Sequence, residues 1–130
     1  LPLDGRKVLI VTDDGVPEEY ARAVLAAASE GEIFTLPAGE KTKSLASFEL
    51  LLRYMLDAGF TRSSAVCAVG GGVGGDLSGF AAACYMRGID FYNIPTTMLA
   101  MTDSSVGGNA PSTFTVRRTR SVLFILRGRW

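Results

Sequence analysis

Short apolar runs alternate with longer segments of helical periodicity along the first hundred residues. Runs rich in β-branched and apolar residues predict buried strands, and they cover residues 7–12, 32–36, 65–69 and 90–94. Apolar spacings of three and four, or runs of small residues, predict helices, which cover residues 17–30, 44–58 and 76–86. This alternation predicts βαβ units, and hence an α/β fold with a Rossmann-like, mostly parallel sheet and helices on both faces.

Apolar side chains mark the face on which each of the first two helices packs. In the first helix Pro17 suits the first helical position, and Tyr20, Val24 and Leu25 share one face. In the second helix six residues form a stripe at helical spacing: Leu45, Phe48, Leu51, Leu52, Met55 and Leu56. Gly59 is placed to end that helix.

The loops that follow the predicted strands carry most of the candidate chemistry. Right-handed crossovers place such loops on one edge of a parallel sheet, where ligands bind near a switch in strand order. The four loops begin at Asp13, Pro37, Gly70 and Pro95. We therefore expect these segments to meet at one edge.

A glycine-rich stretch lies between the third strand and the third helix. Gly70, Gly72 and Gly75 have the spacing G-x-G-x-x-G, which suits a tight turn and N–H groups that face a phosphate. Glycines also permit close packing of a helix on a sheet, so both interpretations stay open. The stretch follows the third strand, and no Gly-Lys-Ser/Thr comes after it, so neither the usual Rossmann fingerprint nor a P-loop fits.

Two carboxylates stand beside this stretch. Asp13, at the tip of the first strand, is the better candidate for an acid that binds a ribose. Asp76 ends the glycine run, where a carboxylate would repel bound phosphates. It either caps the helix or binds a ribose or a cation.

Composition narrows the class of protein. The 130 residues are 48% apolar and 20% charged, as in an ordinary soluble domain. No apolar run approaches the roughly 18–20 residues of a membrane span, and no leader signals export, so we expect a cytoplasmic protein without a membrane partner. Cys67 and Cys84 have no metal-site spacing and are expected to be buried thiols. The absence of histidine removes the commonest general base and zinc ligand.

Five segments, in order and without large gaps, carry a family resemblance. They are residues 37–44 (PAGEKTKS), 70–80 (GGGVGGDLSGF), 85–88 (YMRG), 94–100 (IPTTMLA) and 103–108 (DSSVGG). Together they resemble the 3-dehydroquinate synthase family of sugar-phosphate cyclases. The resemblance covers about residues 7–108, and it implies an NAD-binding α/β domain there, without the family's helical C-terminal metal-binding domain.

The resemblance implies cofactor contacts along the whole edge, from the ribose and adenosine side through the pyrophosphate to the junction of nicotinamide and substrate. The residues at the matching positions are Asp13, Gly39, Glu40, Lys43, Gly71, Gly72, Gly75, Asp76, Thr96, Thr97, Asp103 and Ser104. Asp103 is also expected to act in catalysis. Arg87 resembles a catalytic arginine that reaches across a dimer interface to the substrate phosphate of the partner subunit, a task that suits the fixed donors of a guanidinium.

Each of these positions also has a structural alternative. Glu40 and Lys43 could form a solvated loop pair, and Thr96 and Thr97 could cap the helix that follows them. Arg87 could end its helix by interacting with the helix dipole. Their joint occurrence at family spacing favours the site.

The activity implied by the resemblance is a carbon–oxygen lyase reaction of the shikimate pathway. NAD and a divalent metal, zinc or cobalt, support phosphate elimination from 3-deoxy-arabino-heptulosonate 7-phosphate and its cyclisation to 3-dehydroquinate. Family members are expected to be homodimers, and their metal ligands, a glutamate and two histidines, have no counterpart in this chain. The alternatives are a sister cyclase that makes an aminocyclitol precursor, or a non-catalytic NAD-binding remnant.

The chain departs from the family pattern at several positions. Asn109 stands where the family has a lysine, and Gly15 replaces an asparagine. Gly74 replaces a bulkier apolar residue, and we expect it to loosen the glycine loop.

The last segment differs in charge from the rest. Residues 1–109 hold eight Lys or Arg and thirteen acids, a net charge of −5, whereas residues 110–130 hold five Arg and no acid. We interpret residues 109–130 as a divergent basic tail from a shifted reading frame or an aberrant end, rather than as an arm for nucleic acid. Residues 121–126 could form a strand or stay exposed.

We expect the purified 130-residue chain to release no phosphate from 3-deoxy-arabino-heptulosonate 7-phosphate, because the ligands that the family uses for its metal are absent from its sequence. A coupled assay for phosphate release measures this directly. Turnover by the purified chain would refute the expectation.

Overall fold

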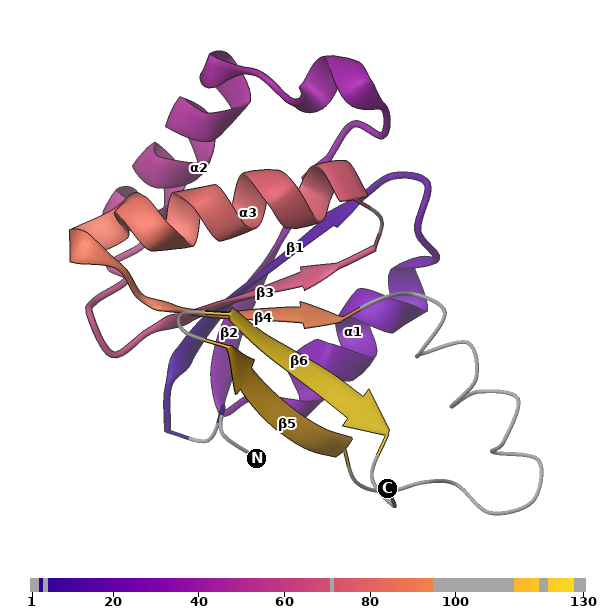
Figure 1. The fold of residues 1–130 in the computed structure, drawn as a ribbon, viewed down its shortest axis with the longest axis vertical. Coiled ribbons are helices and arrows are strands. Elements are labelled where there is room, and N and C mark those ends of the chain that lie inside the picture. The colour runs from indigo at the N-terminus through magenta and orange to yellow at the C-terminus, as the bar shows by residue number, and fades with distance from the viewer. Residues whose placement is uncertain (1–2, 4, 71, 95–113, 120–121, 128–130) are drawn as a thin grey trace.

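The computed structural model of the protein describes residues 3, 5–70, 72–94, 114–119 and 122–127 (Figure 1). Strands and helices alternate through residue 94, and two further strands follow. In chain order the elements are β1 (Lys7–Asp13), α1 (Glu18–Ala27), β2 (Glu30–Leu36), η1 (Glu40–Thr42), α2 (Leu45–Asp57), β3 (Ala65–Val69), α3 (Gly72–Cys84), η2 (Tyr85–Arg87), β4 (Asp90–Ile94), β5 (Phe114–Thr119) and β6 (Val122–Arg127). No helix in the described ranges is both long and apolar enough to span a bilayer.

The strands form one sheet in the order β2-β1-β3-β4-β6-β5. All neighbours are parallel except β5, which runs antiparallel to β6. The mostly parallel α/β fold predicted from the sequence is therefore confirmed. Because β2 and β3 lie on opposite sides of β1, the strand order switches direction between β1 and β3.

The central strands are buried on both faces. Leu9 and Val11 of β1 belong to a core cluster with side chains from α2 and α3. Val8 and Ile10, which point the other way, belong to a second cluster with side chains from α1. Figure 1 shows this three-layer arrangement, with α2 and α3 on one side of the sheet and α1 on the other. Helices thus cover both faces, as the alternation predicted.

The boundary between α1 and β2 differs from the prediction. The helix ends at Ala27 rather than at residue 30, because Glu30 and Gly31 pair with Lys7 and Val8 in the parallel ladder. A Cβ on Gly31 would lie 2.9 Å from the carbonyl oxygen of Val8, so this register requires glycine. Pairing with β1 therefore extends β2 backwards at the expense of α1.

The α2 stripe is only partly buried. Ser44 caps the helix by accepting a hydrogen bond from the Ser47 amide at 3.2 Å, and Leu51 and Met55 are fully buried. The stripe is helical as predicted, but its two ends are not buried, because Leu45 is 82% exposed and Leu56 is 60% exposed. Leu56 follows Met55 by about 100° of helix rotation and so leaves the packed face.

The two cysteines also differ from each other. Cys67 lies in β3 and is buried, and its burial raises the pKa of the thiol. Cys84 is exposed, so the expectation of a second buried thiol is wrong. The buried residues of α3 include Ala81 and Ala82, and Cys84 lies off that face at the end of the helix.

The chain beyond residue 108 contributes two strands to the sheet. Of the two alternatives that the sequence left open for residues 121–126, the structure shows the strand, β6, which pairs with β4 through Phe91 and Val122. The sequence did not indicate β5, which pairs with β6 from Phe114 opposite Arg127.

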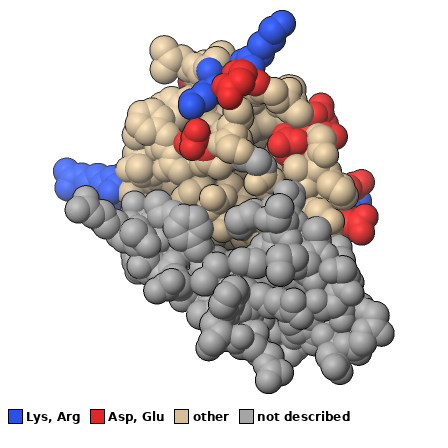
Figure 2. Space-filling view, turned by 45° about the vertical axis from the view of Figure 1, so that its right-hand side comes forward, with Lys and Arg blue, Asp and Glu red and all other residues tan. Residues whose placement is uncertain are grey.

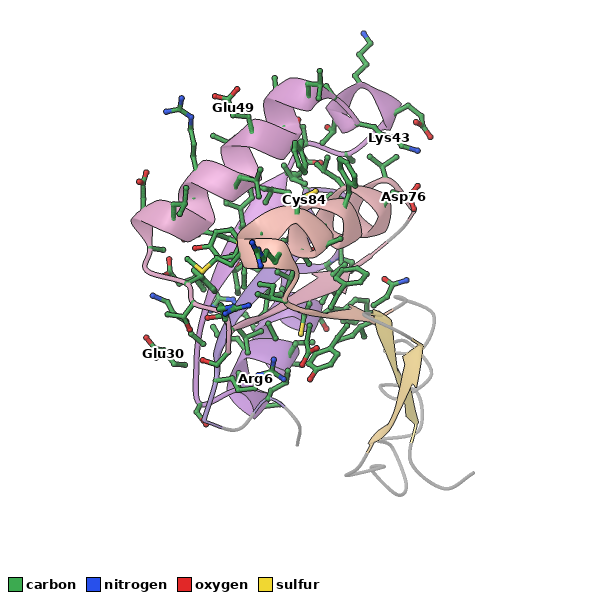
Figure 3. The ribbon with its side chains drawn as sticks, turned by 60° about the vertical axis from the view of Figure 1, so that its left-hand side comes forward. Arg6, Glu30, Lys43, Glu49, Asp76 and Cys84 are labelled. Carbon is green, nitrogen blue, oxygen red and sulfur yellow. The ribbon has the colours of Figure 1, made fainter. Side chains whose placement is uncertain are left out.

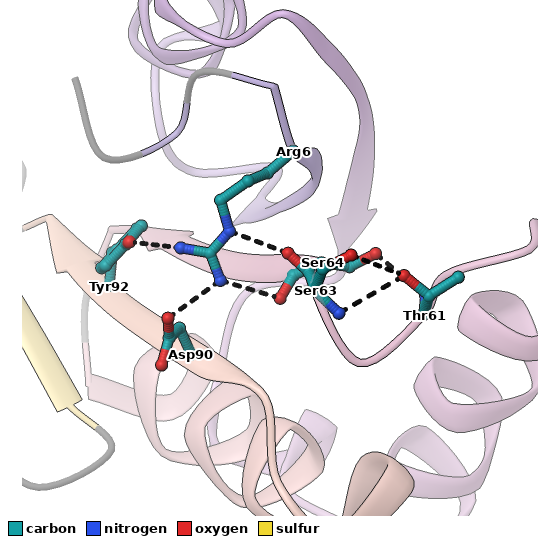
Figure 4. A network of polar contacts seen from close by, with 6 residues as sticks. All are labelled: Arg6, Thr61, Ser63, Ser64, Asp90 and Tyr92. Atoms are coloured by element: carbon teal, nitrogen blue, oxygen red, sulfur yellow. Dashed lines mark hydrogen bonds and ion pairs between the residues drawn. The ribbon is translucent and has the colours of Figure 1, made fainter.

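A network centred on Arg6 ties the amino ends of the strands together (Figure 4). The Arg6 guanidinium donates to the carbonyl oxygens of Ser63 and Ser64 at 2.8 and 3.2 Å. It also donates to the Tyr92 hydroxyl and to Asp90 Oδ2, each at 2.9 Å. Both charged side chains are largely covered, 20% exposed for Arg6 and 24% for Asp90. One side chain before β1 therefore links the starts of β3 and β4.

Substitution Arg6→Met should lower the free energy of unfolding by about 2–3 kcal/mol, because it removes several partners of partly buried polar groups at once. Urea denaturation of the two proteins measures the difference. Arg53→Met is the matched control, since Arg53 pairs with Glu49 at an exposed site, and we expect it to cost no more than about 0.5 kcal/mol. If Arg6→Met lowered the free energy of unfolding by no more than Arg53→Met does, a structural role for the network would be contradicted.

Candidate functional site

The candidate site lies at the carboxyl edge, which we define as the edge formed by the carboxyl ends of β1, β2, β3 and β4. Figure 1 shows the arrowheads of β1, β3 and β4 directed toward the side where α3 begins. In parallel sheets, ligands bind outside the carboxyl ends of the strands at a switch in strand order. Here that switch falls between β1 and β3.

Asp13 and Gly70 meet at the switch. Asp13 is the last residue of β1, and its Oδ1 accepts a hydrogen bond from the Gly15 amide at 2.8 Å. Gly70 follows β3 with φ of 139°, and a Cβ there would lie 3.0 Å from Val16 Cγ2 and 3.5 Å from Asp13 Oδ2. Glycine at position 70 thus lets the turn after β3 lie directly against the end of β1.

Backbone and side-chain hydrogen bonds join the neighbouring loops to this pair. Asp14 Oδ1 accepts a hydrogen bond from the Ala38 amide at 2.9 Å, and the Asp14 amide donates to the Leu36 carbonyl at 3.0 Å. The Gly70 amide donates to the Ile94 carbonyl at 3.3 Å. The predicted convergence of the loops that begin at Asp13, Pro37 and Gly70 is therefore confirmed, and the loop that begins at Pro95 lies outside the described residues.

The glycine stretch becomes helical earlier than predicted. α3 begins at Gly72 rather than near Asp76, so Gly74 and Gly75 form part of its first turns. The expectation that Gly74 loosens a loop is therefore wrong, since position 74 lies in a helix, where glycine lowers helix propensity instead.

The glycines of the stretch serve different purposes. A Cβ on Gly79 would lie 3.1 Å from the Phe91 ring, so this glycine allows α3 to pack closely on β4, whereas a Cβ on Gly75 would make an ordinary van der Waals contact, 3.4 Å from Asn93 Oδ1. A Cβ on Gly72 or Gly74 would meet no atom of the described residues within 4 Å. Packing therefore explains Gly79, but among the described residues it gives no reason for glycine at position 72.

Asp76 is the fifth residue of α3, so it does not cap the helix. Its Oδ2 accepts from the Lys43 ammonium at 3.2 Å, which links the loop after β2 to α3. Figure 3 shows the two labelled side chains directed toward one another at one end of the molecule. Of the alternatives that the sequence left open, the structure therefore excludes the helix cap, and it pairs the carboxylate with a lysine of the same chain.

The segment before Lys43 is a short helix, η1, rather than the plain loop that was predicted. It contains Glu40 and follows Gly39, which has φ of 112°. The Thr42 hydroxyl, in the last residue of η1, donates a hydrogen bond to the Pro37 carbonyl in the loop before it. Figure 2 shows acidic and basic side chains side by side at the top of the molecule, the end where Figure 1 shows η1. The described part of this edge therefore carries both signs of charge.

Arg87 lies away from this group. β3 and β4 are parallel, and α3 runs from the carboxyl end of β3 back to the amino end of β4, so Arg87 lies at the opposite edge of the sheet. Both Met86 and Arg87 have positive φ, 46° and 69°, which is unusual for residues with a side chain. Arg87 is exposed there.

Several expected site residues lie outside the described residues. They are Gly71, Thr96, Thr97, Asp103 and Ser104.

Two residues near the carboxyl edge were not singled out from the sequence. The signal for Asp14 was its place in an Asp-Asp-Gly turn, and the signal for Asn93 was an amide within an otherwise apolar run.

The described stretches do not contain three His, Cys, Asp or Glu side chains close enough to one another to hold a metal. Among the described residues, the carboxyl edge therefore offers carboxylates, lysine ammonium groups and the first turn of α3. A helix start with free N–H groups favours an anion, and a carboxylate near it suits ribose hydroxyls.

The chain is thus a Rossmann-like α/β protein with a glycine-lined carboxyl edge. Residues 33–118 match the model of the 3-dehydroquinate synthase N-terminal family, and the chain belongs to that family. It is 48% identical over 109 residues to a 3-dehydroquinate synthase from Shewanella denitrificans, an alignment that covers 82% of this chain and 30% of that relative. The chain therefore spans about a third of the length of such curated relatives.

Solved structures of related cyclases share the fold. A 2-deoxy-scyllo-inosose synthase complexed with carbaglucose-6-phosphate, NAD+ and Co2+ is 28% identical with a TM-score of 0.67, covering 92% of this chain and 32% of that one. A 2-epi-5-epi-valiolone synthase from Streptomyces hygroscopicus with NAD+ and Zn2+ bound is 30% identical with a TM-score of 0.61. This match covers 88% of this chain and 32% of the synthase chain.

Proposed function

We propose that this chain binds NAD at the carboxyl edge, between the ends of β1 and β3, as the cofactor-binding part of a 3-dehydroquinate synthase. The observation that carries the proposal is the contact between Asp13 and Gly70 at the strand-order switch, beside the open start of α3. Bound NAD in two related cyclases supports the choice of ligand.

The described residues fit this cofactor. One carboxylate oxygen of Asp13 already accepts from Gly15, which fixes the side chain and leaves the oxygen nearest Gly70 to accept from ribose hydroxyls. The first N–H groups of α3 favour a diphosphate, and the absence of a Cβ at Gly72 lets it approach the backbone. We propose that Lys43 and Glu40 contact the adenosine side of the cofactor. The remaining proposed cofactor contacts are Gly71, Thr96, Thr97 and Ser104.

The reaction that we propose for the complete protein is the conversion of 3-deoxy-arabino-heptulosonate 7-phosphate to 3-dehydroquinate with loss of phosphate. The bound dinucleotide supplies reversible hydride transfer, and the part of this chain is to hold and orient it beside the substrate. The described residues do not fit the divalent metal of the related cyclases, and we assign it no ligand in this chain. Asp103 is the proposed catalytic contact at the cofactor–substrate junction.

Arg87 is proposed to act on a second copy of the protein. It lies at the edge opposite the cofactor, on a turn held by hydrogen bonds from Gly88 to Tyr85 at 2.7 Å and from Ile89 to Ala82 at 2.9 Å. A guanidinium held at a fixed, exposed turn can reach a phosphate in a neighbouring subunit but not in its own carboxyl edge. This assignment requires a homodimer.

The second candidate is a sister cyclase that acts on another sugar phosphate. The similarity to solved structures of 2-deoxy-scyllo-inosose and 2-epi-5-epi-valiolone synthases supports it, at 28–30% identity. The 48% identity to a curated 3-dehydroquinate synthase favours the first candidate. A protein that binds NAD without turnover is the third alternative, and titration with NAD alone does not separate it from the first two.

Substitution Gly72→Ala should weaken NAD binding roughly tenfold or more while the protein stays folded. The added methyl group meets no atom of the described residues within 4 Å, but it would occupy the approach of the diphosphate to the helix start. Isothermal titration with NAD measures the loss, and thermal melting confirms that the fold is retained.

Gly74→Ala is the matched control, because position 74 is equally open and lies two residues further along the same helix. We expect it to leave NAD binding unchanged and to stabilise α3 by up to about 1 kcal/mol. Equal binding by the Gly72→Ala variant and the wild-type chain would contradict a diphosphate at this helix start.

A further inference from the structure

Asp76 poses an electrostatic problem for the proposed function. Its carboxylate lies in the second turn of α3, about 6 Å along the axis from the first helical residue. A diphosphate at the helix start would therefore lie close to a negative side chain on the same helix, and like charges at such a separation repel. Without compensation, Asp76 would oppose the attraction that the helix start exerts on anions.

Lys43 supplies a positive charge at that carboxylate. Its ammonium lies 3.2 Å from Asp76 Oδ2, and it comes from a separate element, the residue after η1. An ammonium group has three donors, of which the Asp76 contact uses one. The pair is half exposed, 53% for Lys43 and 65% for Asp76, so salt in the solvent screens it.

We propose that Lys43 is the resident counter-ion of Asp76, and that pairing with this lysine makes the carboxylate compatible with a bound diphosphate. The inference rests on the proposed NAD site. Lys43 would then act in two ways: it neutralises the charge of Asp76, and its own charge attracts the phosphate. Loss of Lys43 then has two costs, since the cation disappears and an uncompensated carboxylate remains beside the ligand.

A double-mutant cycle on NAD affinity tests this role. Lys43→Met should raise the Kd roughly tenfold, and Asp76→Asn alone measures what the carboxylate itself contributes to cofactor binding. Adding Asp76→Asn to Lys43→Met should recover at least part of the loss, because the unpaired carboxylate is gone. A double variant that binds NAD no better than Lys43→Met would overturn the proposal.

Salt dependence separates charge compensation from a structural effect. Between about 20 and 500 mM NaCl, the penalty of Lys43→Met should shrink severalfold, because screening weakens the repulsion between Asp76 and the diphosphate. A penalty that is independent of salt would overturn the proposal in favour of a structural role for the lysine. Arg53→Met removes a cation from another exposed ion pair, at 2.9 Å from Glu49, and should leave NAD affinity unchanged.

The outcomes separate this inference from the function on which it rests. Failure of the folded wild-type chain to bind NAD would overturn the proposed function and the inference together. NAD binding by the wild-type chain without recovery in the double variant would overturn the inference alone.

Discussion

The parallel pairing of β1 with β2 on one side and β3 on the other is the constraint on which the rest of the structure depends. It requires strands that are apolar on both faces, as Val8 to Val11 and Ala65 to Val69 are. It also brings the carboxyl ends of the strands to one edge and creates the switch in strand order between β1 and β3. Asp13 and Gly70 meet there because of this pairing, since 57 residues of sequence separate them.

The two edges of the sheet are held by different kinds of contact. At the amino edge the largely covered Arg6 network joins three strands through one guanidinium. At the carboxyl edge, hydrogen bonds of Asp14 and Gly70 and the half-exposed ion pair of Lys43 with Asp76 join the described parts of the loops. Among the described residues, the more covered polar contacts therefore lie at the edge opposite the candidate site.

The glycine stretch combines packing and binding in one short sequence. Gly70 lets the turn after β3 approach Asp13, and Gly79 lets α3 approach Phe91. A Cβ on Gly72, between them, would meet no atom of the described residues, and this is the position at which we propose that a diphosphate approaches. The spacing G-x-G-x-x-G could not distinguish these purposes, because the distance from each glycine to its neighbours depends on how α3 sits against the sheet.

Local periodicity in the sequence determined the first elements and their order: the strands over residues 7–12, 65–69 and 90–94 and the α/β class follow from runs of apolar residues. It also identified the segments that meet at the carboxyl edge, because parallel strands with helical crossovers leave no other arrangement of those loops. Only the tertiary structure decided the early end of α1, the early start of α3, the exposure of Leu45 and Cys84, and the pairing of Lys43 with Asp76. Each of these results from contacts between elements distant in sequence, on which a pattern of neighbouring residues carries no information.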